Sequence, residues 1–278
     1  MNQLKLRKQV EMFFVEDIGE RDVTTDSIFP KSQQGEIVFL SEDNGVFCGA
    51  DIIETGFSVL NPSIQVTPLV RDGERVETGQ KLATAKGNMR DLLKGERVIL
   101  NLVQRMSGIA TKTRTAVETL NSGYTKISDT RKTTPGLRTI EKYAVTVGGG
   151  HNHRFGLYDA ALIKENHIAF AGSIANAVQA VKKSIGHMVK VEVEAQTKEQ
   201  MLEALAAGAD VIRFINTKPE EIVEWIVHVP ETVTTEVSGG ITLENIASYR
   251  KCGVDYISLG ILTQSVDALK MSVKINFQ

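Results

Sequence analysis

The sequence has few cysteines, no long apolar run and no excess of charge of either sign. Cys48 and Cys252 are its only cysteines, too few for a disulfide framework or a cysteine zinc site. No run approaches the roughly 18 apolar residues of a membrane-spanning helix. The N-terminal residues also lack the apolar region and cleavage site of a signal peptide. We therefore expect a cytoplasmic protein that makes no contact with a membrane.

The charge balance and composition exclude two further classes of protein. The 278 residues include 32 lysines and arginines and 34 aspartates and glutamates, so the net charge is −2. Without a basic excess, we expect no nucleic-acid partner. Apolar residues make up 42% of the chain, which is enough for a packed core and excludes disorder of the whole chain. The length fits one large domain or two modest ones.

The first hundred residues combine helical and β-like patterns. Helical spacing at the start is carried by Leu4, Leu6, Val10, Phe13 and Phe14. Asn-Gly and Asp-Gly turn signals separate short β-like runs, which are Glu36–Leu40, Val46–Cys48 and Ile64–Val70. A helical stripe then extends from Asp91 to about Leu120, and we expect Gly108 to divide it into two helices.

From residue 125 onward, short β-branched runs alternate with helical segments. The strand candidates are Thr125–Asp129, Ala161–Lys164, Lys190–Glu194, Val211–Asn216, Val233–Ser238 and Tyr256–Gly260. The clearest helix candidates between them are Ser173–Ser184, Lys198–Ala207, Pro219–Val227 and Leu243–Cys252. This alternation predicts either a β/α barrel or a doubly wound parallel sheet.

The residues at the strand ends favour the barrel. They are Asp129, Lys164, Glu194, Asn216, Ser238 and Gly260. A barrel gathers all its carboxyl strand ends at one mouth, whereas an open sheet gathers only those beside its switch point. Six strands are clear rather than eight, so we expect an irregular or incomplete barrel.

Cationic residues follow the first strand of this series. Arg131 and Lys132 lie in a loop that we expect to lead into a helix with Pro135 in its first turn. An arginine there can grip a carboxylate or phosphate at two points, and a lysine adds a point charge. The alternative is a pair of exposed surface charges. The strand-end position favours a binding role.

A triple glycine followed by two histidines and an arginine forms the next candidate loop. Its polar residues are His151, His153 and Arg154. Metal binding through the histidines is disfavoured because no nearby acidic or sulfur residue completes a ligand set. We expect a histidine here to donate hydrogen bonds, and Arg154 to add positive charge.

Lys164 and two glutamates complete the charged candidates. Lys164 at its strand end suits anion binding better than a Schiff base or a snorkelling edge position, since other cations converge there. Glu192 and Glu194 share one strand face, because strand residues two apart point the same way. Such glutamates suit Mg²⁺ or ribose hydroxyls, and Glu194 is the stronger candidate because it lies nearer the strand end.

Two glycine segments at late strand ends predict a phosphate site. Ser238, Gly239 and Gly240 are expected to lead directly into a helix, and Gly260 ends the last clear strand. Glycine loops after late barrel strands, with helix N-termini behind them, recur as phosphate sites. Together with the cations and the glutamate, they indicate group transfer on a phosphorylated sugar.

Nearly the whole chain resembles the quinolinate phosphoribosyltransferase family (nicotinate-nucleotide pyrophosphorylase, carboxylating). The motifs that carry the resemblance are DTRKTTPGLR, GGGHNHRFGL, LIKENHI, VEVE, SGGITLENI and GVDYISLG. The resemblance implies an N-terminal α/β sandwich over residues 1–107, completed by 269–278, and an irregular α/β barrel over 108–268. It also implies a homodimer, with each barrel mouth covered by the partner.

The implied reaction converts quinolinate and phosphoribosyl pyrophosphate to nicotinate mononucleotide, pyrophosphate and CO₂ with Mg²⁺, in NAD biosynthesis. In the family pattern Lys132, Glu194 and Lys164 are catalytic, with Glu194 on the metal and Lys132 also serving the phosphoribosyl pyrophosphate. The quinolinate carboxylates would be bound by Arg131, His153, Arg154 and Lys164, with Arg105 reaching across the dimer. The 5′-phosphate would be bound by Ser238, Gly239, Gly240 and Gly260.

One position departs from the family pattern. Ile215 stands where the family usually has an aspartate beside the glutamate, and Arg213 and Gln264 are also unusual. These departures leave two alternatives open. One is a paralogue acting on another pyridine or azole acid, and the other is a catalytically impaired descendant that binds ligand. A Schiff-base aldolase using Lys164 is more distant.

Overall fold

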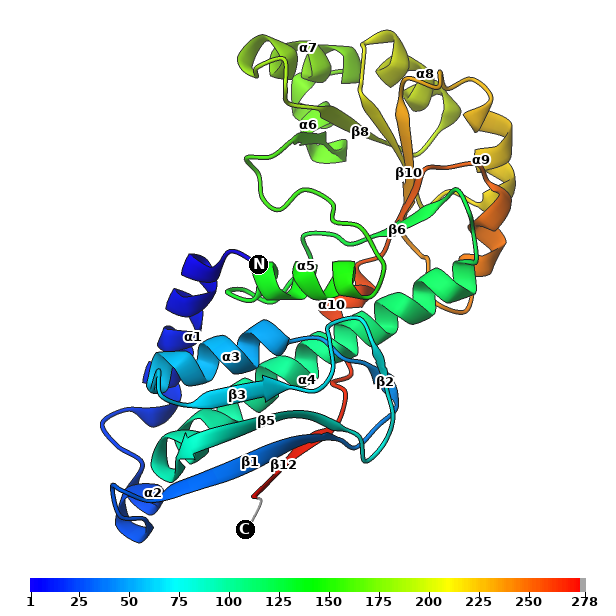
Figure 1. Cartoon of the computed structure of the whole chain (residues 1–278). Coiled ribbons are helices and arrows are strands. Elements are labelled where there is room, and N and C mark those ends of the chain that lie inside the picture. The colour runs from blue at the N-terminus through cyan, green and yellow to red at the C-terminus, as the bar shows by residue number, and fades with distance from the viewer. Residues whose placement is uncertain (276–278) are drawn as a thin grey trace. The chain divides into compact units, whose positions relative to one another are not determined.

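The computed structural model describes residues 1–275 and divides into two compact units. The first unit comprises Met1–Arg114, Thr139–Gly149 and the residues from Ser265 onward. The second comprises Thr115–Arg138 and Gly150–Gln264. Figure 1 labels elements of both units.

Four strands from distant parts of the chain form the sheet of the first unit. Its order is β12-β1-β5-β3, with every neighbouring pair antiparallel. The bounds are β1 (Gln34–Ser41), β3 (Gln65–Pro68), β5 (Lys81–Asn88) and β12 (Met271–Ile275). A separate ribbon joins β2 (Gly45–Val46) to β4 (Arg75–Val76). Since β12 pairs with β1 over Ile37–Ser41, a late segment completes the early sheet; residues 276–278 lie outside the described residues.

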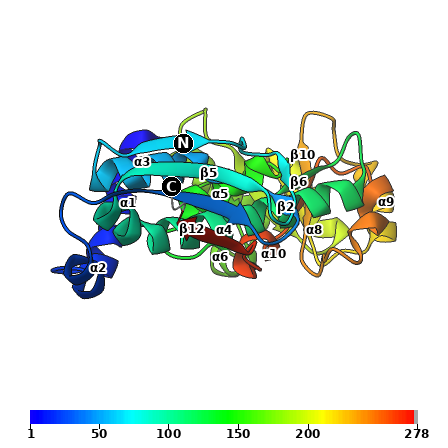
Figure 2. The same ribbon diagram turned by 60° about the horizontal axis from the view of Figure 1, so that its bottom comes forward.

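Helices cover one face of this sheet (Figure 2). They are α1 (Gln3–Ile18), α3 (Ala50–Leu60) and the first part of α4 (Met89–Leu120), while α2 (Val23–Ile28) is a short separate helix. The predicted N-terminal helix is confirmed, and it buries Leu6, Val10 and Phe14 but not Leu4. In the core, the rings of Phe39 and Phe57 meet edge to face at 6.3 Å.

The expected break at Gly108 is wrong, because α4 runs unbroken from Met89 to Leu120. A Cβ atom at Gly108 would lie 2.2 Å from the backbone oxygen of Asp267. The glycine therefore permits a close approach of two backbones and does not end the helix.

The second unit is the expected incomplete barrel. Its six strands are all parallel, in the order β6-β11-β10-β9-β8-β7, with β6 and β7 at the edges. The bounds are β6 (Lys126–Ser128), β7 (Ala161–Ile163), β8 (Val191–Ala195), β9 (Val211–Ile215), β10 (Thr234–Ser238) and β11 (Tyr256–Ser258). All six strand candidates are confirmed, each within one or two residues of the expected bounds.

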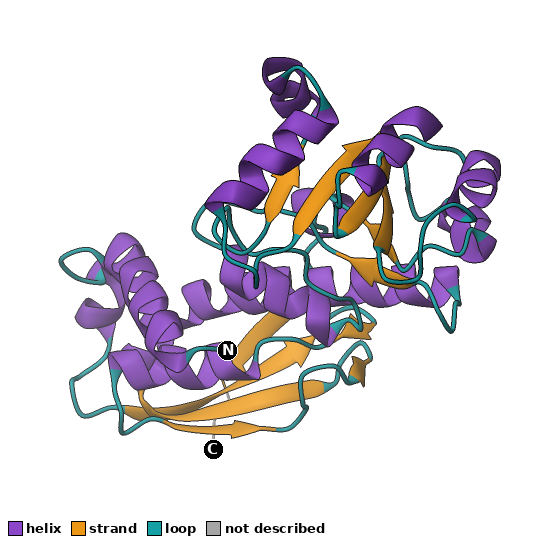
Figure 3. Ribbon diagram, turned by 90° about the horizontal axis from the view of Figure 1, so that it is seen from above, coloured by secondary structure: helices purple, strands orange, loops and turns teal. Residues whose placement is uncertain are grey.

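Helices lie outside the curved parallel sheet (Figure 3). They are α6 (Glu165–Ala171), α7 (Ile174–Ser184), α8 (Lys198–Ala206), α9 (Pro219–Ile226), the 3₁₀ helix η1 (Ile246–Lys251) and α10 (Ile261–Gln264). Side-chain oxygens of Ser173 and Thr197 cap α7 and α8. The helix expected from Leu243 is wrong, since only η1 forms there. Throughout residues 1–275, no helix is long and apolar enough to cross a membrane.

The loop after β6 also differs from the expectation. Helix α5 (Arg138–Val147) begins after a turn that contains Pro135, so this proline precedes the helix and does not lie in its first turn. The loop that carries Arg131 and Lys132 is consequently longer than predicted.

Candidate active site

A pocket of about 520 Å³ opens among the carboxyl ends of the parallel strands in the second unit. Ten of the residues predicted from the sequence line it: Arg131, Lys132, His153, Arg154, Lys164, Glu194, Ser238, Gly239, Gly240 and Gly260. Arg213 and Ile215 line the same pocket. The convergence follows from the parallel sheet, since all its strands end on one side.

Asp129 fixes the histidine-containing loop beside the end of β6. Its carboxylate accepts hydrogen bonds from the backbone N–H of His153 at 2.8 Å and from the Asn152 side chain at 2.7 Å. His151 pairs with β6 in the manner of a strand, its N–H donating to Ile127 at 2.8 Å. The loop is thus held in one conformation, with His153 facing the pocket.

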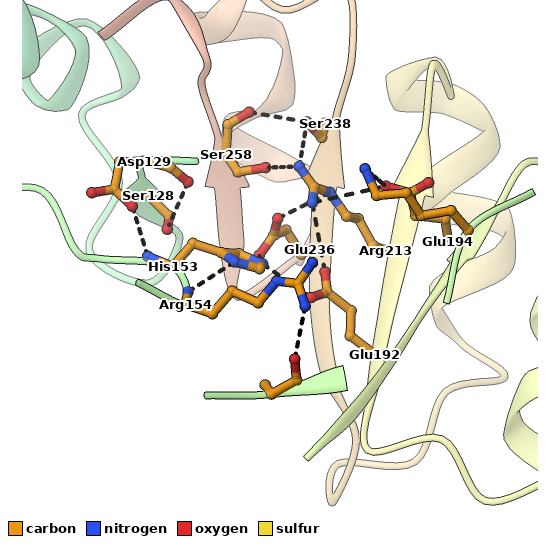
Figure 4. Close-up of polar contacts among 12 residues, drawn as sticks. Ser128, Asp129, His153, Arg154, Glu192, Glu194, Arg213, Glu236, Ser238 and Ser258 are labelled. Atoms are coloured by element: carbon orange, nitrogen blue, oxygen red, sulfur yellow. Dashed lines mark hydrogen bonds and ion pairs between the residues drawn. The ribbon is translucent and has the colours of Figure 1, made fainter. Parts of the chain in front are cut away.

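The imidazole of His153 is oriented from both sides. In the neutral ring, Nδ1 accepts a hydrogen bond from the backbone N–H of Arg154 at 2.9 Å and the proton lies on Nε2. Nε2 faces Glu192 at 3.0 Å and Glu236 at 3.7 Å (Figure 4). Burial lowers the pKa of His153, but the hydrogen bond with Glu192 and the charge of Glu236 raise it by more. The net pKa lies above the ordinary value.

His153, Glu192 and Glu236 also form the one group in residues 1–275 with metal-ligand spacing, their ligand atoms lying within 4.8 Å of one another. Both ring nitrogens of His153 are already engaged, however, and Arg213 places positive charge beside both glutamates. This donor set does not suit a metal. His151 faces Tyr256 instead, with the rings 6.0 Å apart.

Three charged residues, two of which line the pocket, lie side by side on neighbouring strands. Arg213 pairs in register with Glu194 on one side and with Glu236 on the other. Its guanidinium lies 3.2 Å from Glu236, 3.9 Å from Glu192 and 4.0 Å from Glu194. We call Glu192, Arg213 and Glu236 the buried charge group, because all three residues are buried.

Sequence reasoning missed Glu236 and did not assign Arg213 to the site. Both lie inside strands, where a single charged residue carries no positional signal. Only the pairing of β8, β9 and β10 brings them together, and the sequence does not state that register.

Glu194 differs from the other two glutamates in its exposure. Its side chain is 18% exposed, against 6% for Glu192 and Glu236, and it alone of the three lines the pocket. Lys164 approaches it to 3.7 Å. Glu194 is therefore the carboxylate of this cluster that a ligand in the pocket can reach.

Four cations surround the opening, and we call Arg131, Lys132, Arg154 and Lys164 the rim cations. The Nε atoms of Arg131 and Arg154 are buried without a hydrogen-bond partner within residues 1–275. Burial and the charge of Arg131 both lower the pKa of Arg154. Donors without partners and positive charges close together both favour a bound anion.

Backbone conformation shapes the glycine segment after β10. Gly239 and Gly240 both have positive φ, +91° and +65°. A Cβ atom at Gly239 would lie 2.1 Å from Oδ1 of Asn216, whereas at Gly240 nothing lies within 4 Å. The helix expected directly behind this segment is absent: a turn held by Asn245 and Thr242 intervenes before η1. The glycine segment from Ser238 to Gly240, which we call the glycine cradle, is therefore followed by a turn and not by a helix.

Gly260 lets the Lys132 side chain pass close to the end of β11. A Cβ atom there would lie 2.9 Å from Cδ of Lys132. The hydroxyl of Thr263 donates to the backbone oxygen of Lys132 at 2.8 Å and holds the same loop.

Arg105 is the one predicted site residue outside the second unit. It belongs to α4 of the first unit, where its guanidinium pairs with the buried Glu141 at 2.7 Å. Its predicted reach to the ligand of a partner subunit stays a prediction.

Comparison with known proteins identifies the family of the chain. Residues 22–107 match the quinolinate phosphoribosyl transferase N-terminal domain, and residues 109–274 match the C-terminal domain. A probable nicotinate-nucleotide pyrophosphorylase (carboxylating) of Bacillus subtilis is 51% identical over 276 residues, covering 99% of this chain and 95% of that protein.

Solved structures agree with this match. NadC from Streptococcus pyogenes has a TM-score of 0.96 at 35% identity, over 100% of this chain and 99% of that one. The nicotinate-nucleotide pyrophosphorylase from Francisella tularensis has a TM-score of 0.93 at 37% identity, over 99% and 98%. The resemblance read from the motifs is confirmed, and the chain belongs to the quinolinate phosphoribosyltransferase family.

Proposed function

We propose that this protein transfers the phosphoribosyl group of phosphoribosyl pyrophosphate to quinolinate, giving nicotinate mononucleotide, pyrophosphate and CO₂ in NAD biosynthesis. The observation that carries the proposal is one pocket lined both by the rim cations and by the positive-φ glycines of Gly239 and Gly240. Cations suit a dicarboxylate and a diphosphate, and exposed glycine backbone suits a phosphate.

The proposed residue roles divide the pocket into two sides. Arg131, His153, Arg154 and Lys164 bind the carboxylates of quinolinate. Ser238, Gly239, Gly240 and Gly260 bind the 5′-phosphate of the ribose. Lys132 and Glu194 act on the rest of phosphoribosyl pyrophosphate. Lys132 neutralises the diphosphate, and Glu194 binds the ribose. The unpartnered donors of Arg131 and Arg154 support the first assignment.

The chemistry starts at the anomeric carbon of the ribose. The bond to the diphosphate breaks with both electrons leaving on oxygen, and the ribose passes through an oxocarbenium-like state that Glu194 stabilises. The quinolinate nitrogen forms the new bond to carbon. The 2-carboxylate then leaves as CO₂, its bonding electrons are accepted by the pyridinium ring, and a proton replaces it on carbon.

The residues present fit Mg²⁺ carried by the substrate better than a resident ion. Glu194 is the single glutamate of the cluster exposed to the pocket, and Mg²⁺ commonly takes one or two carboxylates together with substrate phosphates and water. Glu194 would hold the ion, which would supply positive charge to the leaving diphosphate.

We further propose a cytoplasmic homodimer in which Arg105 of each chain serves the site of its partner. Arg105 is 27% exposed, and its charge suits a dicarboxylate. Two buried, free cysteines agree with a cytoplasmic location.

The test mixes the protein with quinolinate, phosphoribosyl pyrophosphate and Mg²⁺ and follows nicotinate mononucleotide by chromatography and CO₂ by trapping. We expect equal amounts of both products, and none when nicotinate replaces quinolinate. No product together with no quinolinate binding by calorimetry would contradict the proposal. Binding without turnover would favour the impaired descendant, and turnover of another pyridine or azole acid in preference would favour the paralogue.

A further inference from the structure

Arg213 is the most buried cation that lines the pocket, and the proposed function gives it no role although its guanidinium has several polar partners. Its side chain is 10% exposed, and one terminal nitrogen donates to both Ser238 Oγ at 2.9 Å and Ser258 Oγ at 2.8 Å. The rest of the guanidinium faces carboxylates. Figure 4 shows it at the centre of these contacts.

We infer that Arg213 is a positioning residue that joins the glutamates of β8 and β10 to the two serine hydroxyls on the phosphate side of the pocket. The inference rests on the proposed function, because it assigns Arg213 to the binding of phosphoribosyl pyrophosphate. Arg213 would be an additional residue of that site, and it would act by orienting its neighbours and not by binding the substrate itself.

The hydrogen bonds from Arg213 to the two serine hydroxyls connect it to the phosphate side of the pocket. Ser238 begins the glycine segment and Ser258 ends β11, so Arg213 touches both backbone segments proposed to meet the 5′-phosphate. The Ser238 hydroxyl donates in turn to the backbone oxygen of Ser258 at 3.2 Å. Arg213 therefore sets the separation and the hydroxyl direction of the two segments.

The charge of Arg213 connects it to the glutamates of β8 and β10. Glu192, Glu194 and Glu236 project into one small region, and like charges without a cation between them are costly to bury. A planar guanidinium offers donors in several fixed directions and can face carboxylates while it binds two hydroxyls. A lysine supplies the same charge from one nitrogen and cannot span both sides.

The surroundings of the guanidinium separate this role from direct contact with substrate: its Nε makes no hydrogen bond, but it faces Glu236 at 3.2 Å. Both known hydrogen bonds of the terminal nitrogen end on Ser238 and Ser258, and the remaining nitrogens lie within 4.0 Å of glutamate oxygens. Arg213 thus reaches the ligand through the serines and Glu194.

The test compares Arg213→Met and Arg213→Lys with wild type, using the Kd of phosphoribosyl pyrophosphate with Mg²⁺ and the Kd of quinolinate, each by calorimetry. We expect Arg213→Met to weaken phosphoribosyl pyrophosphate binding about tenfold or more, since two hydrogen bonds are lost. Quinolinate binding should change by less than about threefold, because the rim cations are unaltered. Arg213→Lys should restore folding but not the affinity for phosphoribosyl pyrophosphate.

A double-mutant cycle tests whether Arg213 acts through the serines. In a Ser238→Ala/Ser258→Ala background, Arg213→Lys should weaken phosphoribosyl pyrophosphate binding by less than about twofold, because the partners are already gone. Arg250→Met is the control for loss of an arginine that binds within the protein, since the Arg250 guanidinium donates to the backbone oxygens of Leu120 and Thr119 and Arg250 does not line the pocket. It should leave both affinities unchanged.

The outcomes separate this inference from the proposed function. If wild type binds phosphoribosyl pyrophosphate and Arg213→Lys binds it equally well, the inference is overturned while the proposed function stands. Additive effects in the cycle also overturn it, because they indicate direct contact between Arg213 and the ligand. If wild type binds no phosphoribosyl pyrophosphate, both are overturned.

Discussion

The buried charge group and the rim cations hold similar side chains in opposite electrostatic situations. On β9, Arg213 meets three glutamates and two serine hydroxyls, so its charge is compensated within the protein. At the rim, Nε of Arg131 and of Arg154 have no hydrogen-bond partner among the described residues; Nε of Arg213 lacks one too, but it lies 3.2 Å from a carboxylate oxygen of Glu236. We therefore expect the first arrangement to stabilise the fold and the second to bind an anionic ligand. Mutations should therefore separate stability from binding.

The largest effect is expected from removing a glutamate of the buried charge group. Glu236→Ala leaves Arg213 without its closest carboxylate and His153 with Glu192 alone, and should lower the free energy of unfolding by about 3 kcal/mol. Urea denaturation followed by circular dichroism measures this. Glu194→Ala is the matched control, since that more exposed glutamate should cost less than about 1 kcal/mol. Equal losses for the two variants would remove the distinction.

The next effect concerns the rim. Arg131→Ala should lower kcat/KM for quinolinate by about 30- to 100-fold, because charge-assisted hydrogen bonds to a carboxylate are lost. The free energy of unfolding should stay within about 0.5 kcal/mol of wild type, since no internal partner is abandoned. Steady-state kinetics and urea denaturation on the same preparation test both halves. A large loss of stability would place Arg131 with the buried charge group.

A smaller effect is expected at the glycine cradle. Gly239→Ala adds a methyl group at φ +91° that would meet Oδ1 of Asn216, and should raise the KM for phosphoribosyl pyrophosphate about tenfold. The second variant, Gly239→Ala with Asn216→Gly, removes the colliding side chain and should recover part of the affinity. If the double variant binds phosphoribosyl pyrophosphate no better than Gly239→Ala, the loss of affinity comes from the positive φ and not from the collision with Asn216.

The smallest effect is a pH dependence at the boundary between the two regions. Glu192 and Glu236 raise the pKa of His153 against the opposing effect of burial, so the ring keeps its second proton to higher pH than a free histidine. Quinolinate binding, which gains from this charge, should weaken as pH rises through that raised pKa. Calorimetric Kd values from pH 6 to 9 test the trend. His153→Gln should flatten it, and an unchanged slope would exclude His153 as its source.

The sequence contained enough to predict the rim but, of the buried charge group, only Glu192. Arg131, Lys164 and Ser238 lie at the carboxyl ends of strands or within three residues of them, and parallel strands bring such positions together whatever their register. Arg213 and Glu236 lie within strands, where their meeting depends on how β9 pairs with β10. Pairing register is a long-range property, and a local pattern does not encode it.

The same distinction explains where the fold was predicted and where it was not. All six barrel strands follow from β-branched runs, which are local features. Gly108 was misread as a helix break because its reason is a distant backbone, that of Asp267. The turn after Gly240 was misread as a helix, since the Asn245 side chain binds the N–H of Thr242 and the oxygen of Gly240.

The pairing of β1 with β12 has a consequence for how the chain folds as it is synthesised. Strand β1 is made early, but its partner on one side emerges only after the whole barrel has been made. Until then one edge of β1 presents unpaired backbone groups, which neighbouring nascent chains can bind. The barrel residues can fold first, while the sheet of the first unit must wait for Met271–Ile275. A chain that ends before Met271 would therefore keep one edge of β1 open.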